Sequence, residues 1–351
     1  MGLIDLSMSD LAILALAEIG YSGNLTRMSD IEIPPGTDGM AVELGPMQPE
    51  RSDDIDALDR ATSAFLSVRP RLFGIAYRML GTAAEAEDIV QEVWLRWQST
   101  DRSVVRDATA FLVTTTVRLA ISLAQSARSR RETYIGPWFP EPIDTTADPT
   151  LGAERGEALE MAVLILLEKL SPNERAAYVL REAFAYSHRD IADILQLTEA
   201  NARQLVTRAR KHVADERRAQ VSSSEHRRFL DAFLSAAQNG DITALKAIFA
   251  EDVVSVTDGG GTIGAARVPV LGRERVAKFI STVSSRIWAD LTLTRMQVNG
   301  QSAVLMERGG AIFVVLVVDV SPQGIGQIMW VMNPAKLAAI ARSLPASSQH
   351  S

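Results

Sequence analysis

Three carboxylates have a type and spacing that could do chemistry. Glu85, Asp88 and Glu92 recur at intervals of three and four residues, so a helix would place them in one stripe. Carboxylates close together can act as general acid and base or hold a metal ion. Here, however, no histidine and no glycine-rich loop accompanies them. A docking face for a basic partner is the favoured interpretation, and an ordinary solvated helix face is the alternative.

A second group consists of long hydrogen-bond donors between 203 and 211. Its members are Arg203, Gln204, Thr207, Arg208, Arg210 and Lys211. Donors of this kind on one helix reach base edges and phosphates when the helix lies in a major groove. The alternative is a solvated, arginine-rich surface helix.

A third candidate is Asp258, which could serve as a base in a pocket. Gly259, Gly260 and Gly261 follow it directly and favour a tight loop that another backbone segment approaches closely. We therefore expect no catalytic residue here. The chain has no cysteine and only four scattered histidines, so we expect no metal and no cofactor.

The donors belong to a predicted helix-turn-helix at 186–213, with a tight turn at 196–198. In its second helix the apolar residues recur at helical spacing, and Thr198 is a candidate N-cap. These apolar residues are Ala202, Leu205, Val206, Ala209 and Val213. No glycine occupies the turn, where Gln196 and Leu197 stand.

The carboxylate stripe belongs to a helical unit at 56–130. Ile89, Val93 and Trp97 form the apolar face opposite the acids. We expect breaks near Arg69-Pro70, at Gly81 and over 99–107.

After 226 the pattern changes to an α+β domain. Helices are predicted at 225–238, 241–250 and 273–287, and strands at 253–257, 290–298, 302–308, 311–320 and 325–332. Helices followed by a run of strands predict an antiparallel sheet. The serines of 221–226 suggest a hinge before it.

The connector "YIGPWFPEP" at 134–142 is unusual because linkers are normally small and polar. Its aromatic residues are costly to leave in water, and its prolines reduce the entropy lost on docking. We expect it to pack near the 258–261 loop and the 333–337 turn.

The charge of the chain is uneven. Of 351 residues, 43 are acidic and 36 basic, and twelve of the acids but only three of the bases lie in 1–60. The acidity therefore belongs to an N-terminal tail, which we expect to be flexible, with a short helix at 8–19. The run at 11–20 is too short to cross a bilayer, so we expect a cytoplasmic protein that does not enter the membrane.

Five motifs in order resemble the extracytoplasmic-function sigma factors of bacterial RNA polymerase. "AEAEDIVQEVWLRW" is similar to region 2, 160–213 to region 4, and "GPWFPEP" to the linker of a sigma-J-like subgroup. "DGGG" at 258–261 and "NPAKL" at 333–337 resemble two C-terminal signatures of that subgroup. Phe139 and Ala335 depart from it, since the family has leucine and aspartate there.

The resemblance implies two all-α sigma domains and a cone-shaped SnoaL-like domain. It implies an N-terminal tail at 1–55, region 2 at 56–132, a linker at 133–152, region 4 at 153–220, the SnoaL-like domain at 225–342 and a disordered tail at 343–351. The implied partners are core RNA polymerase, double-stranded promoter DNA and its melted strand. A fused regulatory domain would replace a separate anti-sigma factor.

The resemblance also assigns roles to residues. Asp88, Gln91, Glu92 and Trp94 would bind core polymerase, and Arg118, Arg128, Arg130 and Arg131 would hold the melted minus-10 strand. The six donors of 203–211 would contact the minus-35 element. Linker and regulatory contacts would come from Tyr134, Trp138, Phe139, Pro140, Asp258, Gly259, Gly260, Gly261, Asn333 and Pro334.

Two other functions stay open at this point. One is a helix-turn-helix regulator with a ligand-sensing SnoaL-like domain. The other is a SnoaL-like isomerase or cyclase that its N-terminal half tethers to DNA. Neither needs the acidic helix, which favours the sigma factor.

Overall fold

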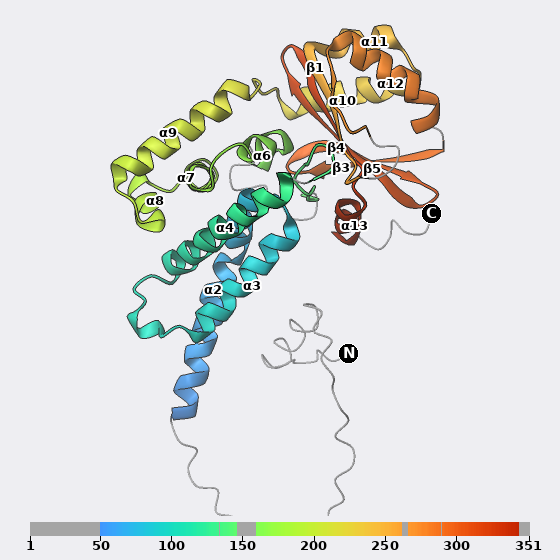
Figure 1. The fold of residues 1–351 in the computed structure, drawn as a ribbon. Coiled ribbons are helices and arrows are strands. Elements are labelled where there is room, and N and C mark those ends of the chain that lie inside the picture. Colours follow the sequence, from blue (N-terminus) through green and yellow to red (C-terminus); the bar gives the residue numbers. More distant parts are fainter. Residues whose placement is uncertain (1–49, 133, 146–158, 262–265, 289, 344–351) are drawn as a thin grey trace, which may run out of the picture. The chain divides into compact units, whose positions relative to one another are not determined.

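The computed structural model describes residues 50–132, 134–145, 159–261, 266–288 and 290–343 (Figure 1). Side chains of 50–58, 127–132, 283–287 and 343 lie outside this description. The chain divides into two units, 1–52 and 53–351, and the fold described here is that of the second. The predicted tail helix at 8–19 and the C-terminal tail after 343 lie outside the described residues.

The first helical domain consists of three long helices and one short turn. They are α2 (Glu50–Leu80), α3 (Ala83–Ser99), η1 (Arg102–Val104) and α4 (Ala108–Glu132). Helix α2 begins at Glu50, within the range expected for the tail, 1–55. The break expected at Pro70 is wrong. Pro70 and Leu66, whose carbonyl would accept the missing N–H, are both exposed, so water can satisfy that carbonyl within a continuous helix.

The second helical domain contains α6 (Met161–Leu167), α7 (Pro172–Glu182), α8 (His188–Leu195) and α9 (Glu199–Glu216). Ser171 and Ser187 begin α7 and α8 with capping boxes, in which each serine accepts from a backbone N–H three residues on. Gln196 takes the left-handed conformation that ends α8, with φ 56°. This is the position where a glycine is usual.

The two helical domains share one hydrophobic core. Buried residues of α2, α3 and α4 pack in the same cluster as buried residues of α7, α8 and α9. Arg175, which is 4% exposed, donates to the carbonyl of Met79 at 2.6 Å and pairs with Glu168. The domains are therefore packed against each other.

The described residues of the C-terminal domain form four helices and a six-stranded sheet. The helices are α10 (Ser223–Gln238), α11 (Ile242–Ile248), α12 (Arg273–Ile287) and α13 (Pro334–Ser343). The strands are β1 (Phe249–Asp258), β2 (Val270–Leu271), β3 (Leu291–Val298), β4 (Gln301–Arg308), β5 (Ala311–Ser321) and β6 (Gly324–Val331). The proposed hinge overlaps the first turn of α10, which Ser222 caps.

The sheet has the order β2-β1-β6-β5-β4-β3. The expectation of an antiparallel sheet is wrong at one place, since β1 and β6 are parallel while all other neighbours are antiparallel. Alternation along a strand predicts the strand but not its partner, so the sequence could not show this pairing. The α+β class is unaffected.

Both faces of the sheet are covered. Phe233, Phe249 and Trp330 lie in the cluster between one face and the helices α10 to α12. On the other face, Leu337 and Ile340 of α13 pack with Phe139 of the connector and Met161 of α6. Residues from outside the domain thus complete its second core.

Candidate functional site

Helix α3 has one buried and one outward face, as its spacing predicts. Ile89, Val93 and Trp97 are at most 4% exposed, and the Trp97 indole N–H donates to the carbonyl of Ala61 at 3.0 Å. Asp88 is exposed, and Glu92 is partly exposed and pairs with Arg96 at 2.7 Å. The acids are therefore available to a partner.

The other two candidates on α3 differ from each other. Gln91 is exposed beside Asp88, whereas Trp94 is half-buried, with its ring centroid 4.8 Å from that of Phe65. Leu95 and Leu66 are more than half exposed. Helix α3 thus presents acids beside the partly exposed Trp94 and the exposed Leu95, and charges of one sign can favour a partner of the opposite charge.

Helix α9 separates its two faces completely. All five residues of its predicted apolar stripe are buried, and all six predicted donors are exposed. The predicted N-cap is also confirmed, since the Thr198 hydroxyl accepts from the backbone N–H of Asn201. A helix that follows a tight turn and presents several hydrogen-bond donors on its outward face can enter a major groove.

Neighbouring carboxylates hold several of these donors. Arg203 pairs with Glu199 at 2.9 Å and Arg210 with Glu182 of α7 at 2.6 Å. Arg208 lies 3.4 Å from Glu174, whose pKa is lowered in spite of partial burial by hydrogen bonds from Ser171 and by Arg208. These pairs are exposed enough to exchange for phosphate.

Helix α4 contains the four arginines expected at the melted strand. Arg118 is exposed, while the side chains of Arg128, Arg130 and Arg131 lie outside the described part. The segment Ala108–Ser126 is long and apolar enough to cross a membrane. Leu112 and Val117 are fully buried in the shared core, so one face of this segment packs against the neighbouring helices.

Asp258 lies at the centre of a buried cluster. It has no exposed surface, and its carboxylate accepts from the Tyr134 hydroxyl (2.5 Å), the Phe139 backbone N–H (2.9 Å) and Lys336 Nζ (2.5 Å). The Gly260 N–H is a fourth donor at 3.2 Å. Every approach to this carboxylate is occupied by the protein itself.

The connector docks on the C-terminal domain through this cluster. The Lys336 ammonium also donates to the Phe139 carbonyl and lies 4.5 Å from the centroid of the Trp138 ring. Asn333 donates to the Tyr134 hydroxyl at 2.6 Å. Burial and the Asp258 carboxylate raise the pKa of Tyr134, which keeps its hydroxyl protonated as a donor.

The predicted glycines allow this close approach. Gly260 has φ 56°, and a Cβ there would lie 2.6 Å from the Asn333 amide nitrogen. Gly259 and Pro140 are buried, Gly261 faces Ile135, and Pro334 begins α13 with its ring exposed. The structure thus brings the expected linker and loop residues together.

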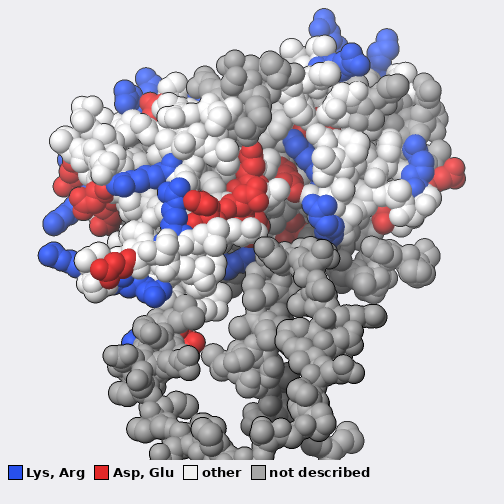
Figure 2. All heavy atoms as spheres, turned by 60° about the horizontal axis from the view of Figure 1, so that its bottom comes forward, with Lys and Arg blue, Asp and Glu red and all other residues white. Residues whose placement is uncertain are grey.

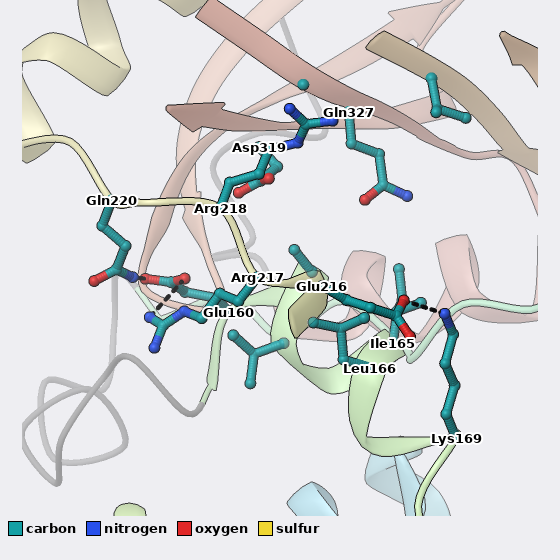
Figure 3. Close-up of a pocket in the computed structure, with 14 residues that line it drawn as sticks. Glu160, Ile165, Leu166, Lys169, Glu216, Arg217, Arg218, Gln220, Asp319 and Gln327 are labelled. Atoms are coloured by element: carbon teal, nitrogen blue, oxygen red, sulfur yellow. Dashed lines mark hydrogen bonds and ion pairs between the residues drawn. The ribbon is translucent and has the colours of Figure 1, made fainter. Parts of the chain in front are cut away.

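A hollow of about 210 Å³ separates α6 and the end of α9 from the sheet (Figure 3). Glu160, which contacts Gln220 and Arg217, lies on its wall, and Lys169 pairs with Glu216 at its edge. Burial raises the pKa of Asp319, which also lines it. Asp258 is not among the lining residues, so the hollow does not serve the base considered for it.

Charge on the surface is local rather than uniform. Figure 2 shows acidic side chains gathered near the middle of one face and basic side chains to either side. A chain with a net charge of −7 can therefore still offer a basic helix such as α9 to DNA.

Three residues of this region were not predicted from the sequence. Lys336 stands within the "NPAKL" motif but was not predicted to pair with Asp258. Tyr77 and Asn299 are buried and hydrogen-bonded to each other at 2.8 Å. The Asn299-Gly300 dipeptide is a strong signal for a hairpin turn, yet nothing local indicates that its side chain is buried.

Two family models match the helical domains. A model described as Sigma-70 region 2 matches residues 64–130, and one described as Sigma-70, region 4 matches 160–213. The second contains the helix-turn-helix, and the first contains α3 and most of α4.

Relatives match more of the chain. It is 38% identical over 224 residues to the ECF RNA polymerase sigma factor SigJ of Mycobacterium tuberculosis, which covers 62% of this chain and 71% of the relative. It is 30% identical to the probable ECF sigma factor SigI of that organism over 82% of this chain and 98% of the relative. The crystal structure of M. tuberculosis SigJ matches with TM-score 0.64 and 31% identity, covering 79% of this chain and 98% of that one.

Proposed function

Because the chain belongs to the extracytoplasmic-function sigma factors of RNA polymerase, we propose that it binds core polymerase in the cytoplasm and directs it to promoters that α9 recognises. The observation that supports this best is the outward face of α9, with six exposed donors over a fully buried apolar stripe. With this assignment, 56–132 acts as region 2, 133–152 as the linker and 153–220 as region 4.

We assign the polymerase contact to Asp88, Gln91, Glu92 and Trp94 on α3. Exposed carboxylates beside partly exposed apolar side chains suit a basic, amphipathic partner surface. Arg118, Arg128, Arg130 and Arg131 of α4 supply cations for the melted minus-10 strand.

Among the α9 donors, position along the helix separates two roles. Recognition helices contact base edges mainly with their N-terminal residues, so Arg203 and Gln204 are assigned to bases. Thr207 and Arg208 lie one turn further on and are assigned to bases or the backbone. Arg210 and Lys211, near the other end, are assigned to phosphates.

Promoter binding requires the two helical domains to separate. The minus-10 and minus-35 elements are about 25 base pairs apart, or roughly 85 Å along a duplex with 3.4 Å per base pair. In the free chain, however, both domains share one core, and Arg175 bonds to Met79. The packed arrangement therefore corresponds to a form that is not bound to a promoter.

The C-terminal domain is proposed to regulate this opening rather than to catalyse a reaction. The Asp258 carboxylate has no exposed surface and accepts from Tyr134, Gly260, Phe139 and Lys336, so all four of its lone-pair sites are occupied and none is left for a substrate. The domain instead holds the connector, whose length sets the spacing of the DNA-binding modules. A regulator within the chain requires no separate anti-sigma factor.

The test is whether the purified chain binds core polymerase and produces a transcript with a defined start. A start that moves with the minus-35 sequence supports the proposal. A matched control is the chain with Arg203, Gln204 and Arg208 replaced by alanine, which keeps the buried face of α9. Binding to DNA as a dimer without polymerase, or no effect on initiation, would instead favour a repressor.

A further inference from the structure

One of the two residues at the tip of the β3–β4 hairpin is buried, although hairpin tips normally face solvent. Asn299 and Gly300 form its two-residue turn, with φ 53° and 77°. Two positive φ values are what a type I′ turn requires, and Asn-Gly is its preferred sequence. The turn alone would explain the residue type, but Asn299 also has no exposed surface.

The Asn299 side chain bonds to three segments that are distant in sequence. Its amide nitrogen donates to the Tyr77 hydroxyl of α2 at 2.8 Å and to the carbonyl of Leu159, just before α6, at 3.1 Å. Its amide oxygen accepts from the Ile143 N–H of the connector at 3.1 Å. One side chain therefore joins both helical domains and the connector to the sheet.

Further bonds surround this contact. The Tyr77 hydroxyl donates to the Glu141 carbonyl at 2.6 Å, and the Asn299 N–H donates to the Ile143 carbonyl at 2.9 Å. Thr145 donates its backbone N–H to Gln297 and accepts from the Gly300 N–H. The connector thus lies along the edge strand β3 like an added strand.

We propose that this hairpin is a latch that opposes separation of the two helical domains, with Asn299 as its positioning residue. The inference rests on the proposed function, because separation matters only for a chain that must span two promoter elements. Releasing the latch frees the connector and the start of α6 together, since the same amide holds both.

The chain offers a substitution that leaves the turn intact. The neighbouring β4–β5 hairpin closes with Gly309-Gly310, at φ 57° and 77°, and nothing lies within 4 Å of a Cβ at either position. Asn299→Gly therefore gives a Gly-Gly turn that this sheet already uses, while it removes the three side-chain bonds. Gly309→Asn is the matched control, because it adds an asparagine where there is nothing to hold.

Hydrogen exchange of the free full-length variants tests the latch without polymerase. We expect Asn299→Gly to accelerate exchange at least tenfold over 141–145 and 161–167, with β4 and β5 unchanged, and Gly309→Asn to have no effect. Tyr77→Phe, which removes only the bridging hydroxyl, should accelerate exchange in the connector as well. Unchanged exchange in both latch variants would overturn the proposal.

Affinity for core polymerase then tests the role of the latch. Asn299→Gly should bind core about tenfold more tightly than the natural chain, equivalent to about 1.4 kcal/mol. If Asn299→Gly exchanges faster but binds core equally or more weakly, the hairpin does not oppose polymerase binding, and its contact is purely structural. Failure of the natural chain itself to bind core would contradict the proposed function. Hydrogen exchange of the free chain does not depend on core binding, so the two failures can be told apart.

Discussion

Among single residues, Asp258 and Lys336 form an ion pair inside the protein. Asp258 is fully buried and the Lys336 side chain is 9% exposed, so neither charge is compensated by water. Removing one partner of such a pair leaves an isolated buried charge. The pair therefore fixes how the connector sits, because Phe139 bonds to both of its members.

Replacing Asp258 by asparagine should lower the free energy of unfolding by about 3 to 5 kcal/mol, because Lys336 loses its counter-charge inside the protein. Urea unfolding measures this. Asp252→Asn is the control, since Asp252 is 72% exposed in its pair with Arg218 and should cost about 1 kcal/mol or less. Equal losses of unfolding free energy in the two variants would mean that the buried pair contributes no more to stability than the exposed one.

Arg203 and Lys211 should respond differently to promoter sequence. Arg203→Ala should cost about 1 to 3 kcal/mol on the natural minus-35 element and relax base preference at one position. Lys211→Ala should weaken binding to every sequence about equally, because a phosphate contact carries no sequence information. The affinity of each variant for the natural and the scrambled minus-35 element, measured at one salt concentration, distinguishes the two roles. The same loss on both elements for both variants would show that neither side chain reads bases.

At the scale of elements, α3 has two faces with separable roles. Replacing Asp88 and Glu92 by lysine should weaken core binding without loss of helix, because both acids point away from the core. Trp97→Ala should instead lower stability by about 3 to 5 kcal/mol, since Trp97 is 3% exposed and packs on Phe111. Affinity and circular dichroism together separate the two effects. Normal core affinity in the charge-reversed variant would refute the assigned interface.

Helix α10 should make stability dependent on pH through His226. The Nε2 atom of His226 lies 2.9 Å from the carbonyl of Val318 and must donate to it. The Nδ1 atom of His226 is buried with no hydrogen-bond partner in the described part of the chain. Burial lowers the pKa of His226, against the opposing effects of Val318 and of Asp319 nearby. Below the ordinary pKa of about 6.5 the unfolded chain binds a proton that the folded chain does not.

The contribution of His226 is therefore fully present above pH 6.5 and is lost as the pH falls toward the lowered value. Between pH 7 and 5 the natural chain should lose more unfolding free energy than His226→Gln, whose amide can still donate to Val318. Denaturation at several pH values measures the difference. Titrating groups that do not interact with His226 cancel because both chains share them, whereas Asp319 interacts with it. Parallel curves would contradict the assigned role.

Some features of the helices and strands could be predicted from the sequence and others could not. The buried stripe of α9 and the two faces of α3 were predictable, because helical spacing determines which side chains share a face. The bounds of α12 were predicted as observed, at 273–287. The parallel β1–β6 pair and the unbroken helix at Pro70 were not, since pairing and tolerance of a lost bond depend on surroundings that a local pattern does not contain.

Among candidate functional residues the same division holds. The contact of the aromatic connector with the glycine loop followed from the cost of exposing Trp138 and Phe139. Asn299 and Tyr77 are 222 positions apart, so their bond leaves no local signature in either segment. Nothing in the sequence around Lys336 indicates a buried partner, so its bond to Asp258 was not predicted.

At the scale of the whole molecule, the C-terminal domain and the sigma half complete each other. Phe139 and Met161 are at most 2% exposed and lie in the same cluster as Val315, Val317 and Met329 of the sheet. Burying an apolar side chain contributes roughly 1.5 to 3 kcal/mol. Separating the sigma half from the C-terminal domain would expose apolar surface on both. The C-terminal domain is therefore part of the fold of the free chain.

Truncation should reveal this dependence in two steps. Removal from residue 333 deletes α13 with Lys336 and Asn333, which leaves the Asp258 carboxylate without its cation and the connector partly released. Removal after 222 deletes the whole sheet and exposes Phe139 and Met161 to water. We expect altered promoter activity from the first and lost or deregulated activity from the second. Removal of only 344–351 is the control.

Hydrogen exchange over 134–142 and Trp138 fluorescence, with the other tryptophans replaced, report directly whether the connector is docked. A connector that exchanges as fast in the full chain as in the shortest one would show that the domain does not hold it, whatever the promoter activities.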